Sequence, residues 1–301
     1  MRFASFFSLL IPSLLLMGCT PGSVVHETAL PETAAPAPTP SEGSATASET
    51  TIPDPNSWMM IWSDEFDQPD GSAPDSTKWN HQTGGAGWGN GELQHYTDKL
   101  ENAHIQNGML VIKANKEYML GRDYTSARLT TQFKADWTYG RYEIRAKLPN
   151  TQGIWPAFWL FPTRAVYGSG AAGGEIDIME MIGSEPGRSY ATLHYGNPPE
   201  HSSGYYDLPA GKTYADDFHI FAVEWEPTEI RWYVDDTLFH SANKWFTTNK
   251  KDAVFPAPYD QDFYLIINIA VGGTWPGSPD ETSVFPQMLY VDYVRVYQHP
   301  K

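Results

Sequence analysis

The sequence predicts an all-β fold: a two-sheet β-sandwich, most simply a jelly roll. Short alternating or apolar runs are separated by turn residues about every ten positions. No stretch long enough for a helix of ordinary length has a convincing helical period. Aromatic residues make up 14% of the chain, which also contains 25 glycines and 24 prolines. This composition suits a fold with many turns better than it suits a helical bundle.

Individual strands are expected where the runs occur. Along 140–148, charged residues alternate with apolar ones, as they do in a strand that buries one face. The run 263–271 is nearly continuous in apolar residues, which predicts a strand buried on both faces. The other expected strands are 110–114, 189–195, 219–225, 230–234 and 290–297.

Composition divides the chain into three parts. Residues 1–18 are predicted to be a lipoprotein signal peptide, because a short apolar run leads into Leu16-Met17-Gly18-Cys19, which resembles a bacterial lipobox. Residues 19–55, rich in Pro, Thr, Ser and Ala, predict a disordered tether because they offer little apolar surface to bury. Residues 56–299 contain no internal repeat and are predicted to form one folded domain.

Cys19 is the only cysteine, so an intrachain disulfide is excluded. A lipid on Cys19 would make the protein a secreted, membrane-anchored lipoprotein of a bacterial cell envelope, at the outer membrane or cell surface. The alternative is an ordinary signal peptide with an incidental cysteine. The net charge of −16 argues against nucleic acid and anionic membrane surfaces as partners, and a monomer is the default expectation.

Three carboxylates lie close together in the sequence at Glu175, Asp177 and Glu180. On a regular strand the first two share a face and Glu180 lies on the other, but a β-bulge at Ile178 or Met179 would return Glu180 to the same face. Crowded carboxyl groups push one pKa upward and leave a neighbour ionised. That arrangement supplies a general acid beside a nucleophile, which suits cleavage of a glycosidic bond. Solvated charges on an exposed strand are the simpler alternative.

Other motifs accompany these acids along the chain. They are WSDEF at 62–66, GNGELQ at 89–94, YTSAR at 124–128, YGR at 139–141, GIWPAFW at 153–159, LHY at 193–195 and VDYVRVY at 291–297. In this order they resemble the family 16 glycoside hydrolases, and most closely the laminarinase-like bacterial endo-β-1,3-glucanases, which carry the longer E-x-D-x-x-E motif.

The resemblance implies a curved jelly roll with a concave substrate cleft and a retaining double displacement. It makes Glu175 the nucleophile, Glu180 the acid/base and Asp177 the carboxylate between them. The spacing permits this, because four pleats separate the two Glu Cα atoms by about 13 Å, and inward-leaning side chains can close that gap toward the ~5 Å of retaining enzymes.

Aromatic residues near the motifs are candidate sugar contacts. Trp155 and Trp159 lie four apart in an extended segment, so both can face a cleft and stack on pyranose rings. The resemblance places them on the nonreducing side of the cut. Trp275 and Trp88, in Gly-rich loops, are further candidates, and ordinary core packing is the alternative for each of these residues.

Polar candidates come mainly from the resemblance. It implies that Asn90 and Arg128 contact the substrate and that His194 lies in the cleft beside the acids. For Glu92, a structural role in its loop is an equally good interpretation. A structural role is the alternative for His194 too, because a lone histidine on an alternating strand often has one.

No motif for a catalytic metal occurs, so no cofactor is expected for catalysis. The resemblance implies one structural Ca²⁺ on the convex face, held by Glu65, the Gly108 carbonyl and Asp292. Hard oxygen ligands of this kind suit calcium.

Two classes of function follow. The leading hypothesis is a surface-anchored endo-β-1,3-glucanase that cuts laminarin-type chains, with the same mechanism on mixed-linkage β-glucan or a galactan as an alternative. The other class is a non-catalytic glycan-binding lipoprotein of the cell surface, against which the presence of all three acids argues.

Overall fold

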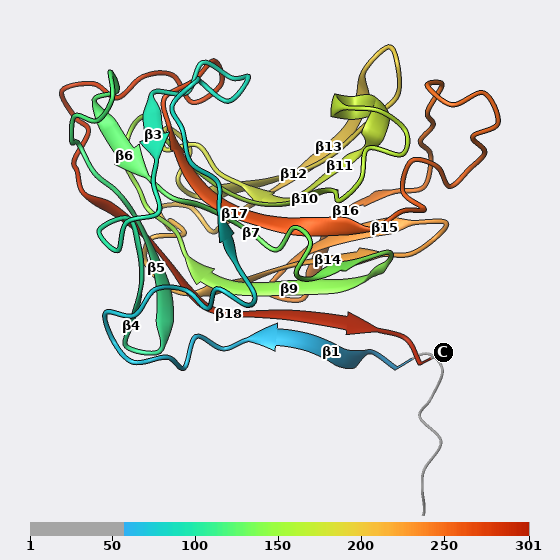
Figure 1. Ribbon diagram of the computed structural model, residues 1–301, viewed down its shortest axis with the longest axis horizontal. Helices are drawn as coiled ribbons and strands as arrows, with labels where there is room; N and C mark the ends of the chain where they lie inside the picture. Colours follow the sequence, from blue (N-terminus) through green and yellow to red (C-terminus); the bar gives the residue numbers. More distant parts are fainter. Residues whose placement is uncertain (1–56, 301) are drawn as a thin grey trace, which may run out of the picture. The chain divides into compact units, whose positions relative to one another are not determined.

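Two large antiparallel sheets make up most of the computed structural model, which describes residues 57–300 (Figure 1). We name each sheet after one of its strands, the β18 sheet and the β11 sheet. The β18 sheet has the order β16 (Thr237–Ala242), β15 (Ile230–Val234), β14 (His219–Trp225), β9 (Gly140–Lys147), β18 (Gln287–Gln298), β5 (Met109–Ala114) and β4 (Ala103–Gln106), with β1 (Met59–Asp64) also paired to β18.

The β11 sheet forms the second layer. Its order is β13 (Glu200–Asp207), β12 (Arg188–Tyr195), β11 (Glu175–Glu180), β10 (Ile154–Pro162), β17 (Phe263–Val271), β7 (Arg128–Thr130) and β2 (Asn80–His81), with β8 (Asp136–Trp137) also paired to β17. Outside the two sheets lie the parallel pair β3 (Gln94–Tyr96) and β6 (Tyr124–Ser126) and the 3₁₀ helix η1 (Gly170–Gly173).

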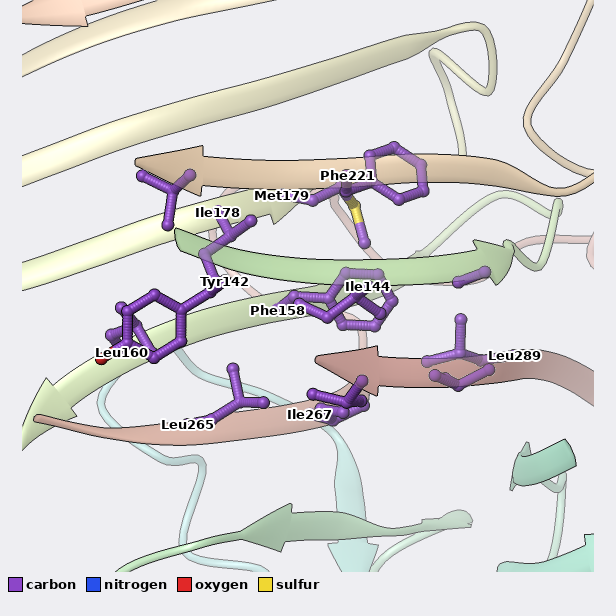
Figure 2. Close-up of a cluster of buried hydrophobic side chains, with 14 of the residues drawn as sticks. Tyr142, Ile144, Phe158, Leu160, Ile178, Met179, Phe221, Leu265, Ile267 and Leu289 are labelled. Carbon is purple, nitrogen blue, oxygen red and sulfur yellow. The ribbon is translucent and has the colours of Figure 1, made fainter. Parts of the chain in front are cut away.

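The core fills the space between the sheets. Ile144 of β9 and Leu289 of β18 gather with Phe158 of β10 and Ile267 of β17 in one buried cluster (Figure 2). All four side chains are fully buried. Because apolar burial is the main favourable term in folding, this cluster fixes how the two sheets lie on one another.

The all-β prediction is confirmed. Burial alternates strictly along β9, and every residue of β17 is buried, as the sequence patterns predicted. The other expected strands are β5, β12, β14, β15 and β18, with ends that differ by at most three residues. Among residues 57–300, η1 is the one helix, and no helix there has the length and apolar character needed to cross a membrane.

Candidate active site

A β-bulge in β11 gathers the three carboxylates, as predicted. Asp177 pairs with Thr192 of β12 and Glu180 pairs with Tyr190, so two residues of β11 stand opposite one residue of β12. The two residues that stand opposite Ala191 are Ile178 and Met179, and both side chains are buried in the core. The bulge therefore returns Glu180 to the face that carries Glu175 and Asp177.

That face forms the floor of a cleft. A cavity of about 740 Å³ lies over the β11 sheet, whose long strands are visibly curved (Figure 1). Every predicted catalytic and substrate-binding residue contributes to its lining. These residues are Glu175, Asp177, Glu180, Asn90, Arg128, Trp155, Trp159, His194 and Trp275, joined by Trp88 and Glu92.

Burial raises the pKa of each of the three acids. Burial, and then the charge of Asp177, raise the pKa of Glu175 to about 8, while burial raises the pKa of Asp177 to about 8 as well. Burial and the two neighbouring carboxylates raise the pKa of Glu180 well above its usual value. Three adjacent negative charges are thus strongly disfavoured, and Glu180 is well suited to keep a proton.

His194 lies beside the acids on β12, directly opposite Glu175 in the sheet. Its Nε2 is 3.1 Å from Asp177 Oδ2 and 3.9 Å from Glu175 Oε1. The first contact lacks the alignment of a hydrogen bond, so Asp177 Oδ2 is a buried oxygen that accepts no hydrogen bond from residues 57–300. The charge of His194 lowers the pKa of Glu175, which favours the ionised form of that carboxyl.

Trp155 of β10 does more than present an aromatic face. Its indole Nε1–H donates a hydrogen bond to Glu180 Oε1 at 3.0 Å. This hydrogen bond lowers the pKa of Glu180 and so opposes, in part, the effect of burial. The contact also holds the Glu180 carboxyl in one orientation over the cleft.

Arg128 of β7 is held between two aromatic rings. Its guanidinium carbon lies 4.8 Å from the centroid of Trp88 and 4.6 Å from that of Trp159, and its Nε–H donates to Gln82 Oε1 at 2.6 Å. A guanidinium fixed in this way presents its remaining N–H groups to the cleft in a constant geometry. Its charge also lowers the pKa of Glu175.

Asn90 and Glu92 have different surroundings at the edge of the cleft. The Glu92 side chain is buried and accepts hydrogen bonds from Asn90 Nδ2 at 3.1 Å and Gln94 Nε2 at 2.6 Å. Glu92 therefore acts as a structural anchor that orients Asn90, which lies in an exposed turn at the cleft.

Asn268 and Trp232 are among the residues at the site that were not predicted from the sequence. Asn268 of β17 accepts the indole N–H of Trp159 at 2.8 Å, and Trp232 of β15 donates to the Asp177 carbonyl at 2.9 Å. Asn268 carried a usable signal, because it is the one amide in an otherwise apolar run. Trp232 carried none, since its partner comes from the opposite sheet.

The residues expected to bind calcium fit that role in part. Both carboxylate oxygens of Glu65 accept hydrogen bonds from Arg295, at 2.9 and 2.8 Å. Asp292 Oδ2 accepts one from Arg145 at 2.7 Å. Gly108 lies in the turn between β4 and β5, beside the part of β18 that holds Asp292. Glu65 and Asp292 are thus both ion-pair partners of arginines here.

The predictions for the first part of the chain fall outside the described residues. They comprise the signal peptide at 1–18, the lipidated Cys19 and the tether at 19–55, and they stay predictions.

Known proteins match this chain over most of its length. The family profile described as Glycosyl hydrolases family 16 matches residues 90–294. The Beta-glucanase of Rhodothermus marinus is 47% identical over 249 residues, which covers 80% of this chain and 85% of that protein. Glucan endo-1,3-beta-glucosidase A1 of Niallia circulans is 42% identical over 261 residues, which covers 79% of this chain and 38% of that protein.

The fold is similar to solved structures as well. The X-ray structure of the laminarinase from Rhodothermus marinus superposes with a TM-score of 0.73 at 46% identity, covering 81% of this chain and 99% of that one.

Proposed function

The chain belongs to family 16 of the glycosyl hydrolases, and we propose that it is an endo-β-1,3-glucanase that cleaves laminarin-type chains with retention of configuration. One observation carries the proposal: the bulge in β11 aligns Glu175, Asp177 and Glu180 on the floor of an aromatic-lined cleft. The similarity to a laminarinase and to a glucan endo-1,3-beta-glucosidase supports the choice of glucan.

In the first step of the proposed reaction, Glu180 gives its proton to the glycosidic oxygen as the Glu175 carboxylate attacks the anomeric carbon. The bond from this carbon to the glycosidic oxygen breaks, the reducing-side sugar leaves, and a glycosyl ester forms on Glu175. The raised pKa of Glu180 supports its role as the acid, because the group must carry a proton before the bond breaks.

In the second step, Glu180 is a carboxylate and acts as the base. It takes a proton from water while the water oxygen attacks the anomeric carbon and releases Glu175. Two inversions at the same carbon give net retention. His194 and Arg128 support the nucleophile, since both lower the pKa of Glu175 and so favour its charged form.

Trp155 and Trp159 would bind the nonreducing side of the chain on β10. Their side chains share the cleft face of that strand, so a sugar chain crossing β10 meets both rings. Aromatic planes stack on the C–H faces of pyranose rings and exclude water from the reacting bond.

The test is to incubate the purified protein with laminarin, mixed-linkage β-glucan, agarose and carrageenan and to follow new reducing ends. Strong release from laminarin is expected, with none from the Glu175→Gln variant, and NMR of the first product should show the β-anomer. Release from mixed-linkage glucan or a galactan alone would keep the mechanism and reject the substrate. Binding without release would place the protein among glycan-binding lipoproteins.

The signal peptide and Cys19 support a further part of the proposal, a lipid-anchored protein of the bacterial cell surface. A structural calcium ion at the Gly108 carbonyl and Asp292 is proposed on the resemblance and on the neighbouring positions of these residues. No catalytic step depends on either feature.

A further inference from the structure

The edge strand β13 has one face packed and one face open. On the packed face, Ser202 Oγ lies 3.2 Å from His240 Nε2 of the opposite sheet. Gly204 lies so close to the same histidine that a Cβ atom there would come within 2.7 Å of its ring. This face of β13 therefore packs against the opposite sheet, and its contacts do not account for the residues on the other face.

The open face continues the cleft. His201 and Ser203 line the cavity, and Tyr205 is the next residue on the same face. Tyr205 is 55% exposed. A large ring at the edge of a sheet gains little from the core at that exposure.

The Tyr205 ring is nevertheless held in place. The guanidinium carbon of Arg188 lies 4.1 Å from its centroid, and Arg188 is fixed by two hydrogen bonds to Asp207, at 2.7 and 2.9 Å. Arg188 therefore lies over the ring, while more than half of the surface of Tyr205 stays exposed. Holding the Arg188 and Tyr205 side chains in place costs conformational entropy when the protein folds. A ligand that binds to this ordered surface then loses less entropy on binding.

Aromatic rings connect this position to the acid. Trp155, which donates to Glu180, packs edge-on against Trp275 at 5.4 Å between centroids. Trp275 packs against Tyr190 at 5.0 Å, and Tyr190 lies 6.2 Å from its cross-strand partner Tyr205. The rings form a continuous line from Glu180 across β12 to β13.

The direction of the substrate follows from the strand order. If β10 binds the nonreducing side, then β12 and β13, on the opposite side of β11, lie under the sugars that leave with the glycosidic oxygen. A pyranose ring is about as wide as the ~4.8 Å between strands, so β13 lies under the second of these sugars.

We propose that Tyr205, supported by Arg188, is a sugar-binding platform for the second glucose unit on the reducing side of the cleaved bond. The inference rests on the proposed function, because it names a position in the same cleft. It makes Tyr205 a determinant of where along a chain the enzyme cuts.

The test is to compare Tyr205→Ala with the wild-type protein on reducing-end-labelled laminarihexaose and on an aryl laminaribioside. The aryl substrate has no sugar beyond the bond that is cut. For the hexaose, the variant should lose about three- to tenfold in kcat/KM, the range expected for one aromatic contact. Its cuts should also move toward the labelled end, while kcat/KM for the aryl substrate stays unchanged.

Two further variants complete the design. Tyr205→Trp should restore the wild-type cutting pattern, and Tyr118→Ala, an exposed tyrosine outside the cleft lining, should have no effect. Equal losses on both substrates, or a Tyr205→Ala variant that behaves like Tyr118→Ala, would overturn the platform. A wild-type protein that cleaves no β-1,3-glucan would instead overturn the proposed function.

Discussion

The hydrogen bond from Trp155 to Glu180 makes a prediction about the pH dependence of catalysis. In Trp155→Phe an aromatic ring remains, but the indole N–H, whose nitrogen lies 3.0 Å from Glu180 Oε1, is lost. That N–H stabilises the charged form of Glu180, so its removal raises the pKa of this carboxyl further. A hydrogen bond to a charged group contributes ~1.5 kcal/mol at the low end of its range, which corresponds to about one pKa unit.

The sign follows from the proposed role of Glu180 as the acid. Activity falls at high pH when this group loses its proton, so the alkaline limb of kcat/KM for laminarin should move upward by about one pH unit. Trp159→Phe is the matched control, because it removes the same N–H from a neutral partner, Asn268 Oδ1 at 2.8 Å. The control should lower kcat/KM without moving the limb. An unmoved or lowered limb in Trp155→Phe, with the fold intact by circular dichroism, would refute the reasoning.

Four further predictions concern stability, ions and anchoring. Glu180→Gln should raise Tm at pH 8 relative to wild type and lose this advantage toward pH 4.5. Folding raises the pKa of the Glu180 carboxyl, so this group destabilises the folded state increasingly as the pH rises above the ordinary pKa of a glutamate. An equal Tm difference at both pH values would contradict the prediction. Ile267→Ala, at the centre of β17, should lower the free energy of unfolding by about 2–5 kcal/mol in urea titrations, and a loss below 1 kcal/mol would show that the site collapses around the cavity. EDTA should lower Tm, and added Ca²⁺ should restore it, if the Gly108 carbonyl and Asp292 hold the ion; a Tm that ignores the chelator would leave Asp292 as an ion-pair partner alone. Cys19→Ala should abolish incorporation of labelled palmitate in a bacterial host, whereas labelling that persists would reject the lipobox.

The bulge in β11 was predictable because two independent requirements met at the same residues. The acids at 175, 177 and 180 need a common face, and Ile176 and Met181 need the core. A regular strand satisfies neither requirement, because it turns Glu180 away from the other two acids and Met181 away from Ile176. One inserted residue satisfies both, so the chemistry of the motif indicated a backbone irregularity that secondary-structure propensity alone would not reveal.

β13 shows where this kind of reasoning fails. Its sequence, EHSSGYYD, offers no alternation of apolar and polar residues, because the packed face uses Ser202 and Gly204 against His240 and the open face serves the cleft. A strand with small residues on its inner face and a cleft along its outer face lacks the period that burial normally imposes. Its position became visible only from its pairing with β12.

The pairing of site residues was unpredictable for a related reason. The sequence identified Trp155, Arg128 and Glu180 as types suited to sugar binding and acid catalysis, but each depends on a partner from a distant segment. Gln82 fixes Arg128 across 46 positions and Trp155 reaches Glu180 across 25. These partners are set by the register between β10 and β11 and between β7 and β2, and a shift of one residue would turn every one of these side chains to the opposite face. The chemistry of this cleft therefore depends on two sets of residues: the motif residues themselves and the apolar residues that hold the strands in register.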